Sequence, residues 1–165
     1  MNSLPPAAQF SPDALALRDP DAALFVDRLQ ALGSRALIAN IEAEAFVEQA
    51  DGHTLPVLVT DGAIGTSYVA APHSAYALYP RAELDLVDMG SMRGPATLAI
   101  AAADGMLRAL AINRAVQIDN WLLSTCLHGD WNGEGLTDLR QRLATRYPGH
   151  YLLIRSVDDW SCPEL

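Results

Sequence analysis

The residues best suited to chemistry lie between positions 119 and 130, where polar side chains follow a short apolar step. Cys126, His128 and Asp130 have the side-chain types of a nucleophile, a base and an orienting carboxylate. Their close spacing argues against a catalytic triad, because triads usually gather their members from distant chain segments. We therefore interpret them as ordinary loop residues, and a cysteine hydrolase built on Cys126 is the weakest functional alternative.

Hydroxyl and amide side chains in the same stretch offer a second kind of chemistry. Ser124 and Thr125 could donate hydrogen bonds to a ligand carbonyl or phosphate, or could bond to nearby backbone and cap the next turn. Asn120, beside Asp119, could hold a substrate amine or amide, or could satisfy neighbouring loop amides. Strand ends that open into polar loops often carry ligands in α/β proteins, so we expect the site here.

Two further candidates come from other parts of the chain. Tyr68 could act as a general acid, although a half-buried sheet aromatic is the alternative. Arg155 could bind a carboxylate or phosphate through two hydrogen bonds, or could pair with Asp158 or Asp159. His53 and His150 have no evident partner in the sequence.

The elements that must position these residues follow from the spacing of apolar and turn-forming residues. Residues 1–20 read as an irregular lead-in, and residues 21–165 as a single domain that could be half of a longer protein. We expect helices over residues 21–32, 75–87, 96–111 and 137–147, and strands over residues 36–49, 55–60, 66–70, 112–118 and 150–156. This pattern predicts an α/β protein of the α+β type, with a mixed, mostly antiparallel central sheet flanked by helices.

Two details of this prediction are specific. Asp51-Gly52 and Asp61-Gly62 are turn signals, so residues 36–70 read as an antiparallel meander. Residues 96–111 are rich in alanine and leucine and read as a buried helix. The inner face that we predict for this helix consists of Leu98, Ala102, Met106, Leu107 and Leu110.

Composition excludes several functions. The chain has 11 basic residues, all of them arginine, against 20 acidic ones, and its net charge is −9. Without lysine it can form neither a Schiff base nor a phosphate loop of the Gly-Lys-Ser/Thr kind. The acidic balance gives a nucleic-acid surface little support.

No apolar run approaches the roughly 20 residues of a membrane helix, and the first residues do not resemble a secretory signal, so we expect a cytoplasmic protein. The spacing of its cysteines and histidines matches no zinc site, and we expect no metal.

Residues 116–125 (VQIDNWLLST) and 146–156 (RYPGHYLLIRS) carry a family resemblance, together with residues 55–62 and 67–72. Over roughly residues 36–156 the chain looks similar to bacterial proteins related to the GNAT and Fem-type acyltransferases. The resemblance implies a mixed α/β fold and transfer of an acyl group from a thioester, such as acetyl-CoA or another acyl-CoA, to an amine. The chain differs from these proteins in two respects. Cys126 stands where the group has asparagine, and we find no Gln/Arg-x-x-Gly-x-Gly/Ala stretch at a helix start to hold the pyrophosphate.

The resulting hypothesis is the N-terminal half of a GNAT-like N-acyltransferase. Asn120, Ser124 and Thr125 would position the substrate, Tyr68 would be the acid and Arg155 the anion contact. The expected partners are a small-molecule amine or a second acyltransferase half-domain, with no nucleic acid and no membrane, and a homodimer is left open. The alternative is a non-catalytic acidic binding module on the same fold, which the missing glycine-rich stretch favours.

Overall fold

The computed structural model of the chain describes residues 21–125 and 128–158, so the predicted lead-in and Cys126 lie outside the described residues. In chain order the elements are α1 (Ala22–Leu32), α2 (Ser34–Leu37), β1 (Glu44–Ala50), β2 (His53–Asp61), the π-helix η2 (Ser74–Leu78), α3 (Tyr79–Glu83), the 3₁₀-helix η3 (Gly90–Met92), α4 (Arg93–Ala109), β3 (Arg114–Ile118), α5 (Leu136–Arg146) and β4 (Tyr151–Ile154). The predicted fold class, helices with a mixed, mostly antiparallel sheet, is confirmed.

The sheet has the strand order β1-β2-β3-β4, and its first two pairings are antiparallel. The predicted Asp51-Gly52 turn joins β1 to β2, and both residues have positive φ, 47° and 84°, as a two-residue hairpin turn requires. The chain then passes from β3 through α5 to β4, which pairs with β3 in parallel. Such a parallel pair needs a crossover, and α5 supplies it.

The strand predicted at residues 66–70 is wrong, because this segment forms turns. The Ala70 amide bonds to the Ser67 carbonyl, and the carbonyls of Val69 and Ala70 accept hydrogen bonds from the Asn120 and Gln117 side chains. These backbone groups are therefore satisfied outside the sheet, and β3 takes the place beside β2 that the meander prediction assigned to residues 66–70.

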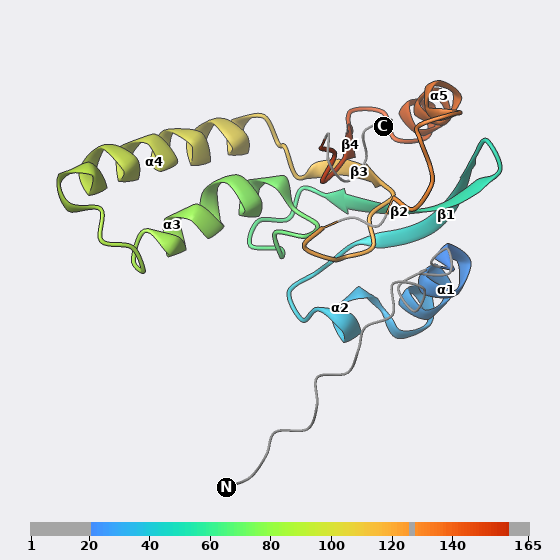
Figure 1. Ribbon diagram of the computed structural model, residues 1–165, viewed down its shortest axis with the longest axis horizontal. Helices are drawn as coiled ribbons and strands as arrows, with labels where there is room; N and C mark the ends of the chain where they lie inside the picture. The colour runs from blue at the N-terminus through green and yellow to red at the C-terminus, as the bar shows by residue number, and fades with distance from the viewer. Residues whose placement is uncertain (1–20, 126–127, 159–165) are drawn as a thin grey trace, which may run out of the picture.

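Each face of the sheet carries its own core. Alternate residues of β2 point to opposite faces, as in any strand. Val57 and Val59 pack with Leu139 and Leu143 of α5, whereas Leu58 packs with residues of α1 on the other side. In Figure 1, α5 lies above the sheet and α1 with α2 lies below it. The central strand β2 is therefore covered on both faces.

The bounds of α1 agree with the helix predicted over residues 21–32, and a suitable residue stands at each end. The Asp21 side chain accepts a hydrogen bond from the Leu24 amide at 2.8 Å, and the helix ends at Gly33, whose φ is 80°. The strand predicted over residues 36–49 is correct only in its second half, because α2 occupies residues 34–37. The last helix, predicted over residues 137–147, begins at Leu136, directly after Gly135.

Residues 74–109 form an arm that extends away from the sheet, with α4 running back alongside η2 and α3 (Figure 1). The prediction that α4 is buried is wrong: none of its residues is buried. Leu98 is 72% exposed and Met106 58% exposed, although both belong to the predicted inner face. The half-buried side is instead formed by Ala96, Ile100, Ala103, Asp104 and Leu107.

Candidate functional site

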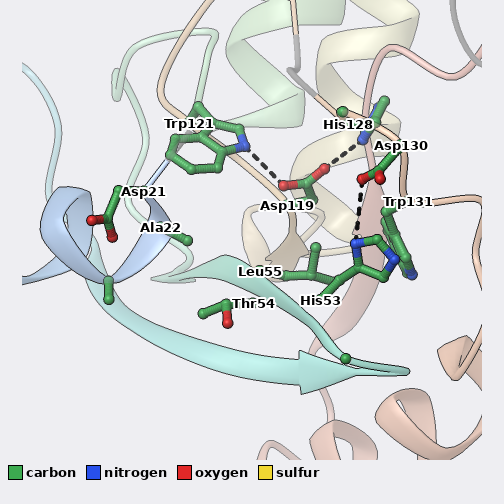
Figure 2. A pocket seen from close by; sticks show the side chains of 13 residues that line it. Asp21, Ala22, His53, Thr54, Leu55, Asp119, Trp121, His128, Asp130 and Trp131 are labelled. Atoms are coloured by element: carbon green, nitrogen blue, oxygen red, sulfur yellow. Dashed lines mark hydrogen bonds and ion pairs between the residues drawn. The ribbon is translucent and has the colours of Figure 1, made fainter. Parts of the chain in front are cut away.

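A cavity of about 380 Å³ lies beyond the end of β3, where the β1–β2 turn and the start of α1 approach it. We call it the tryptophan cavity, because Trp121 and Trp131 both line it. The loop after β3 and the start of β2 supply the polar groups (Figure 2). Its lining includes Asp21, His53, Asp119, Trp121, His128, Asp130 and Trp131.

At the inner end of the tryptophan cavity, Asp119 joins two side chains. It is the first residue after β3, has a φ of 56° and is almost fully buried. Its Oδ1 accepts a hydrogen bond from Trp121 Nε1 at 2.8 Å, and its Oδ2 lies 2.7 Å from His128 Nδ1. Figure 2 shows the two rings reaching the carboxylate from opposite sides. Both carboxylate oxygens are therefore used within the protein.

The other nitrogen of His128 also has a partner in the protein. His128 Nε2 lies 2.9 Å from the Arg155 carbonyl, which can only accept a hydrogen bond. Both ring nitrogens of His128 therefore face oxygen atoms of the protein, an arrangement that favours the doubly protonated, charged ring. The hydrogen bond to Asp119 raises the pKa of His128; burial opposes this shift, while the charge of Asp119 and the Arg155 carbonyl reinforce it. His128 thus fastens the ends of β3 and β4 together and is not free to act as a base.

A second histidine is placed differently. His53 is the first residue of β2, directly after the Asp51-Gly52 turn, and its side chain is one-third exposed. His53 Nδ1 lies 3.5 Å from Asp130 Oδ1 (Figure 2). A carboxylate at this nitrogen orients the ring and leaves Nε2 as the nitrogen that can meet a ligand. His53 and Asp130 are therefore the candidate base and its candidate carboxylate partner in the tryptophan cavity.

The remaining walls suit a positively charged ligand. Trp121 and Trp131 offer aromatic surfaces, while Asp21 and Asp130 add carboxylates at the rim. Aromatic faces beside carboxylates attract ammonium groups through cation–π and ionic interactions. Within residues 21–125 and 128–158, no group of three or more His, Cys, Asp or Glu side chains is arranged to hold a metal ion.

The N-terminus of α5 adjoins this cavity. Trp131 Nε1 donates a hydrogen bond to the Glu134 carbonyl at 3.0 Å, which ties the cavity wall to the segment before the helix. Gly133 and Gly135 have φ values of 88° and 73°. A Cβ on Gly135 would lie 2.9 Å from the Asp51 amide nitrogen, so glycine allows the helix start to contact the β1–β2 turn. Gly133 and Gly135 have the glycine spacing of the acyltransferase signature before α5, but Asp130 stands where that signature has glutamine or arginine.

Of the predicted site residues, Asn120 has a structural position. It is fully buried. Its Nδ2 donates to the Val69 carbonyl at 2.9 Å and to Gln117 Oε1 at 2.7 Å, and its Oδ1 accepts from the Leu122 amide at 2.8 Å. These bonds hold the loop after β3 against residues 66–70. Ser124 and Thr125 are exposed on that loop and are not part of the cavity lining.

Tyr68 and Arg155 are brought together, but at a different hollow. Both line a depression of about 520 Å³ between the base of the arm and the end of β4. The Tyr68 ring packs against Tyr79 with centroids 5.2 Å apart, and Arg155 donates hydrogen bonds to the carbonyls of Val69 and Leu123. The five residues predicted from sequence therefore do not meet at one site.

The sequence pattern missed the His53–Asp130 pair. His53 begins β2 whereas Asp130 lies in a loop, and 77 positions separate them, so only the closing of the sheet brings them together. The signal that could have drawn attention to His53 is its place directly after an Asp-Gly turn, at the start of the longest predicted hairpin.

The fold and site together define an α+β protein with a four-stranded mixed sheet and an aromatic, acidic cavity at one end of its central strands. Comparisons of the chain with protein-family models, with curated proteins and with solved structures found no match. Among the helices described, none has both the length and the apolar character needed to cross a membrane.

Proposed function

We propose that the chain is an N-acyltransferase, which transfers an acyl group from a thioester to an amine bound in the tryptophan cavity. The observation that carries this proposal is the His53–Asp130 pair at a cavity whose other walls are tryptophans and carboxylates. The resemblance to GNAT-related acyltransferases supports it. The order of antiparallel strands, glycine turn, helix α5 and parallel strand β4 is compatible with that resemblance.

The amine would bind first as a cation and react as a neutral base. Asp21 and Asp130 attract the ammonium group, and the tryptophan faces hold the adjoining apolar part of the molecule. His53 Nε2 then takes a proton from the nitrogen, since only a neutral amine has the electron pair needed for attack. The amine nitrogen forms a bond to the thioester carbonyl carbon and the carbon–sulfur bond breaks. The second proton lost by the nitrogen goes to the leaving thiolate, and the proton held by His53 passes to solvent.

The thioester would lie toward the N-terminus of α5. Backbone amides at a helix start favour negative charge, and the Gly133-Glu134-Gly135 turn leads into this one. Gly133 and Gly135 are spaced like the two glycines of the acyltransferase signature, and Asp130 stands at the position of its usual glutamine or arginine. The net charge of −9 opposes a polyanionic donor such as acetyl-CoA. The donor is therefore best tested both as acetyl-CoA and as the uncharged acetyl-N-acetylcysteamine thioester.

A thiol-release assay with phenethylamine as the amine tests the proposal. We expect His53→Gln to lower kcat/KM by about 10²- to 10⁴-fold, the usual worth of a positioned base. Asp130→Asn should lower it by about tenfold, because the His53 ring loses its orienting carboxylate. The control is Asp27→Asn, which removes an exposed carboxylate of α1 away from the cavity. Absence of thiol release with either donor, or equal activity of His53→Gln, would contradict the proposal.

The acidic character of the cavity also favours a second candidate, an amine-binding module without turnover. Calorimetric titration with phenethylamine distinguishes the two functions. A binding module binds the amine, releases no thiol from either donor and loses affinity in Trp131→Ala while keeping it in His53→Gln.

A further inference from the structure

Most side-chain hydrogen-bond donors that line the tryptophan cavity are already used by the protein. Trp121 Nε1 donates a hydrogen bond to Asp119 at 2.8 Å, and Trp131 Nε1 donates one to a backbone carbonyl at 3.0 Å. The two ring nitrogens of His128 lie 2.7 Å and 2.9 Å from oxygen atoms of the protein. These N–H groups hold the cavity wall together and are not offered to a ligand.

Two carboxylates at the rim, in contrast, can accept hydrogen bonds from a ligand. Asp21 precedes α1 and Asp130 lies in the loop after β3, both are exposed, and Figure 2 shows them on different sides of the cavity. One oxygen of Asp21 accepts the Leu24 amide, and one oxygen of Asp130 lies 3.5 Å from His53 Nδ1. A carboxylate accepts at both of its oxygens, so each can still bind an N–H group of a ligand.

The start of α1 is the one part of the wall that would ordinarily favour an anion. Ala22 and Ala23 line the cavity, and the first backbone amides of a helix carry partial positive charge. Here the Asp21 side chain caps the helix, so the protein itself supplies the negative charge at this end. An acidic group of a ligand would have to approach the Asp21 carboxylate to reach these amides.

We propose that the amine bound by the tryptophan cavity carries no acidic group. The inference rests on the proposed function, because it assumes that the cavity is the amine site. It narrows the ligand to a small apolar amine without a carboxylate or phosphate, and it excludes free amino acids. The ammonium group of an amino acid is attracted to Asp21 and Asp130, but its carboxylate is then held beside the same two charges.

The rest of the lining agrees with this ligand class. The cavity of about 380 Å³ is near the small end of ligand pockets, which span about 300–1,000 Å³. Leu55 and the two tryptophans give it apolar walls. Of the side chains described in the lining, His53 and Thr54 keep a polar hydrogen for a ligand. Thr54 is neutral and His53 is proposed to accept a proton, so neither gives an acidic group a fixed positive partner.

Calorimetric titration of the whole chain at pH 7 with three matched ligands tests the inference. Phenethylamine should bind, and phenylalanine, which differs from it by one carboxylate, should bind at least about tenfold more weakly because of the charges at the rim. Phenylalaninamide has an uncharged group at the same position and should recover most of the lost affinity.

The outcomes separate this inference from the proposed function. If phenethylamine does not bind, the amine site itself is wrong and both proposals fail. If phenethylamine and phenylalanine bind equally, the amine site stands and the exclusion of acidic groups is wrong. If phenylalaninamide is rejected as strongly as phenylalanine, size and not charge selects the ligand, which also overturns the inference.

A single substitution checks that charge at the rim causes the preference. Asp21→Asn removes the charge but keeps a side chain that caps helices well, so α1 should remain intact. The ratio of the phenethylamine and phenylalanine affinities should fall about twofold to fivefold, the usual strength of an exposed charge pair. Asp27→Asn, on the exposed side of the same helix and outside the cavity lining, is the control and should leave the ratio unchanged. An unaltered ratio in Asp21→Asn would contradict the inference.

Discussion

Two histidines line one cavity, and their partners give them different roles. His128 has a partner at each ring nitrogen, the Asp119 carboxylate and the Arg155 carbonyl, so its charged form is favoured and it has a structural task. His53 has one carboxylate partner and a partly exposed ring, which is the arrangement of a group that exchanges protons with a ligand. Sequence context does not separate the two, because the acceptors come from distant positions.

The raised pKa of His128 predicts how stability depends on pH. The charged ring stabilises the fold fully below about pH 6.5, the ordinary histidine value, and this contribution disappears as pH rises through the raised pKa. We expect His128→Gln to lower the free energy of unfolding by about 2–4 kcal/mol at pH 6, because Asp119 loses its buried partner. Urea unfolding at pH 6 and pH 9 measures both effects.

The difference between the variants identifies the titrating group. The loss of stability between pH 6 and pH 9 should be smaller in His128→Gln than in the wild type, whereas His53→Gln should retain it. An unchanged alkaline loss in His128→Gln would show that another group is responsible.

At the scale of elements, the start of α5 and the β1–β2 turn are built for close contact. Gly135 caps the helix with positive φ and leaves room for the backbone of residues 50–51. Trp131, packed in the same core as Leu139 and Leu143, fixes the segment that leads into the helix. One contact thus holds together the crossover helix, the hairpin and the wall of the tryptophan cavity.

Gly135→Ala tests that contact. The added Cβ would lie 2.9 Å from a backbone nitrogen and would also sit at positive φ, so we expect a loss of about 2 kcal/mol or more. The control is Gly94→Ala at the start of α4, where nothing lies within 4 Å of the added Cβ, and stability should change by less than about 1 kcal/mol. Thermal or urea unfolding compares the two; similar losses would contradict the assigned role of Gly135.

At the scale of the molecule, the chain divides into a sheet with two covered faces and an arm with little cover. β2 pairs on both edges and is buried along most of its length, whereas α4 contains no buried residue. His73 connects the two parts: it is fully buried at the base of the arm, and its Nε2 lies 2.7 Å from Asp104 Oδ1 of α4. This contact and the bond to Arg108 hold the pKa of Asp104 below its ordinary value.

Hydrogen exchange should reveal this division. We expect the amides of α4 to exchange at least about 10²-fold faster than those of β2, because few buried contacts oppose local opening of the arm. Equal protection of α4 and β2 would mean that the arm unfolds only with the sheet.

Sequence patterns predicted those elements whose signals are local. Asp21 and Gly33 mark the ends of α1, and Asp51-Gly52 makes the hairpin turn, because caps and two-residue turns depend on the residues at those positions. Residues 66–70 have β-forming side chains, but their carbonyls bond to Gln117 and Asn120, about 50 residues further on.

Burial and the candidate site were harder to predict for the same reason. The periodicity of α4 correctly predicts a helix, yet it does not say whether the second apolar side is covered by the same chain. Asn120 has the side chain of a ligand-binding residue, but the closure of the sheet seals it in the core. His53 looked isolated because Asp130 joins it only after β2 has paired with β3.

The position of the arm has a consequence for how the chain folds. Residues 62–113 separate β2 from β3, so the two central strands can pair only after a loop of this length has closed. The β1–β2 hairpin, by contrast, closes through two residues. Folding should therefore begin with this hairpin and α1. The pairing of β3 with β2 should then limit the folding rate, as expected for contacts between residues far apart in the chain.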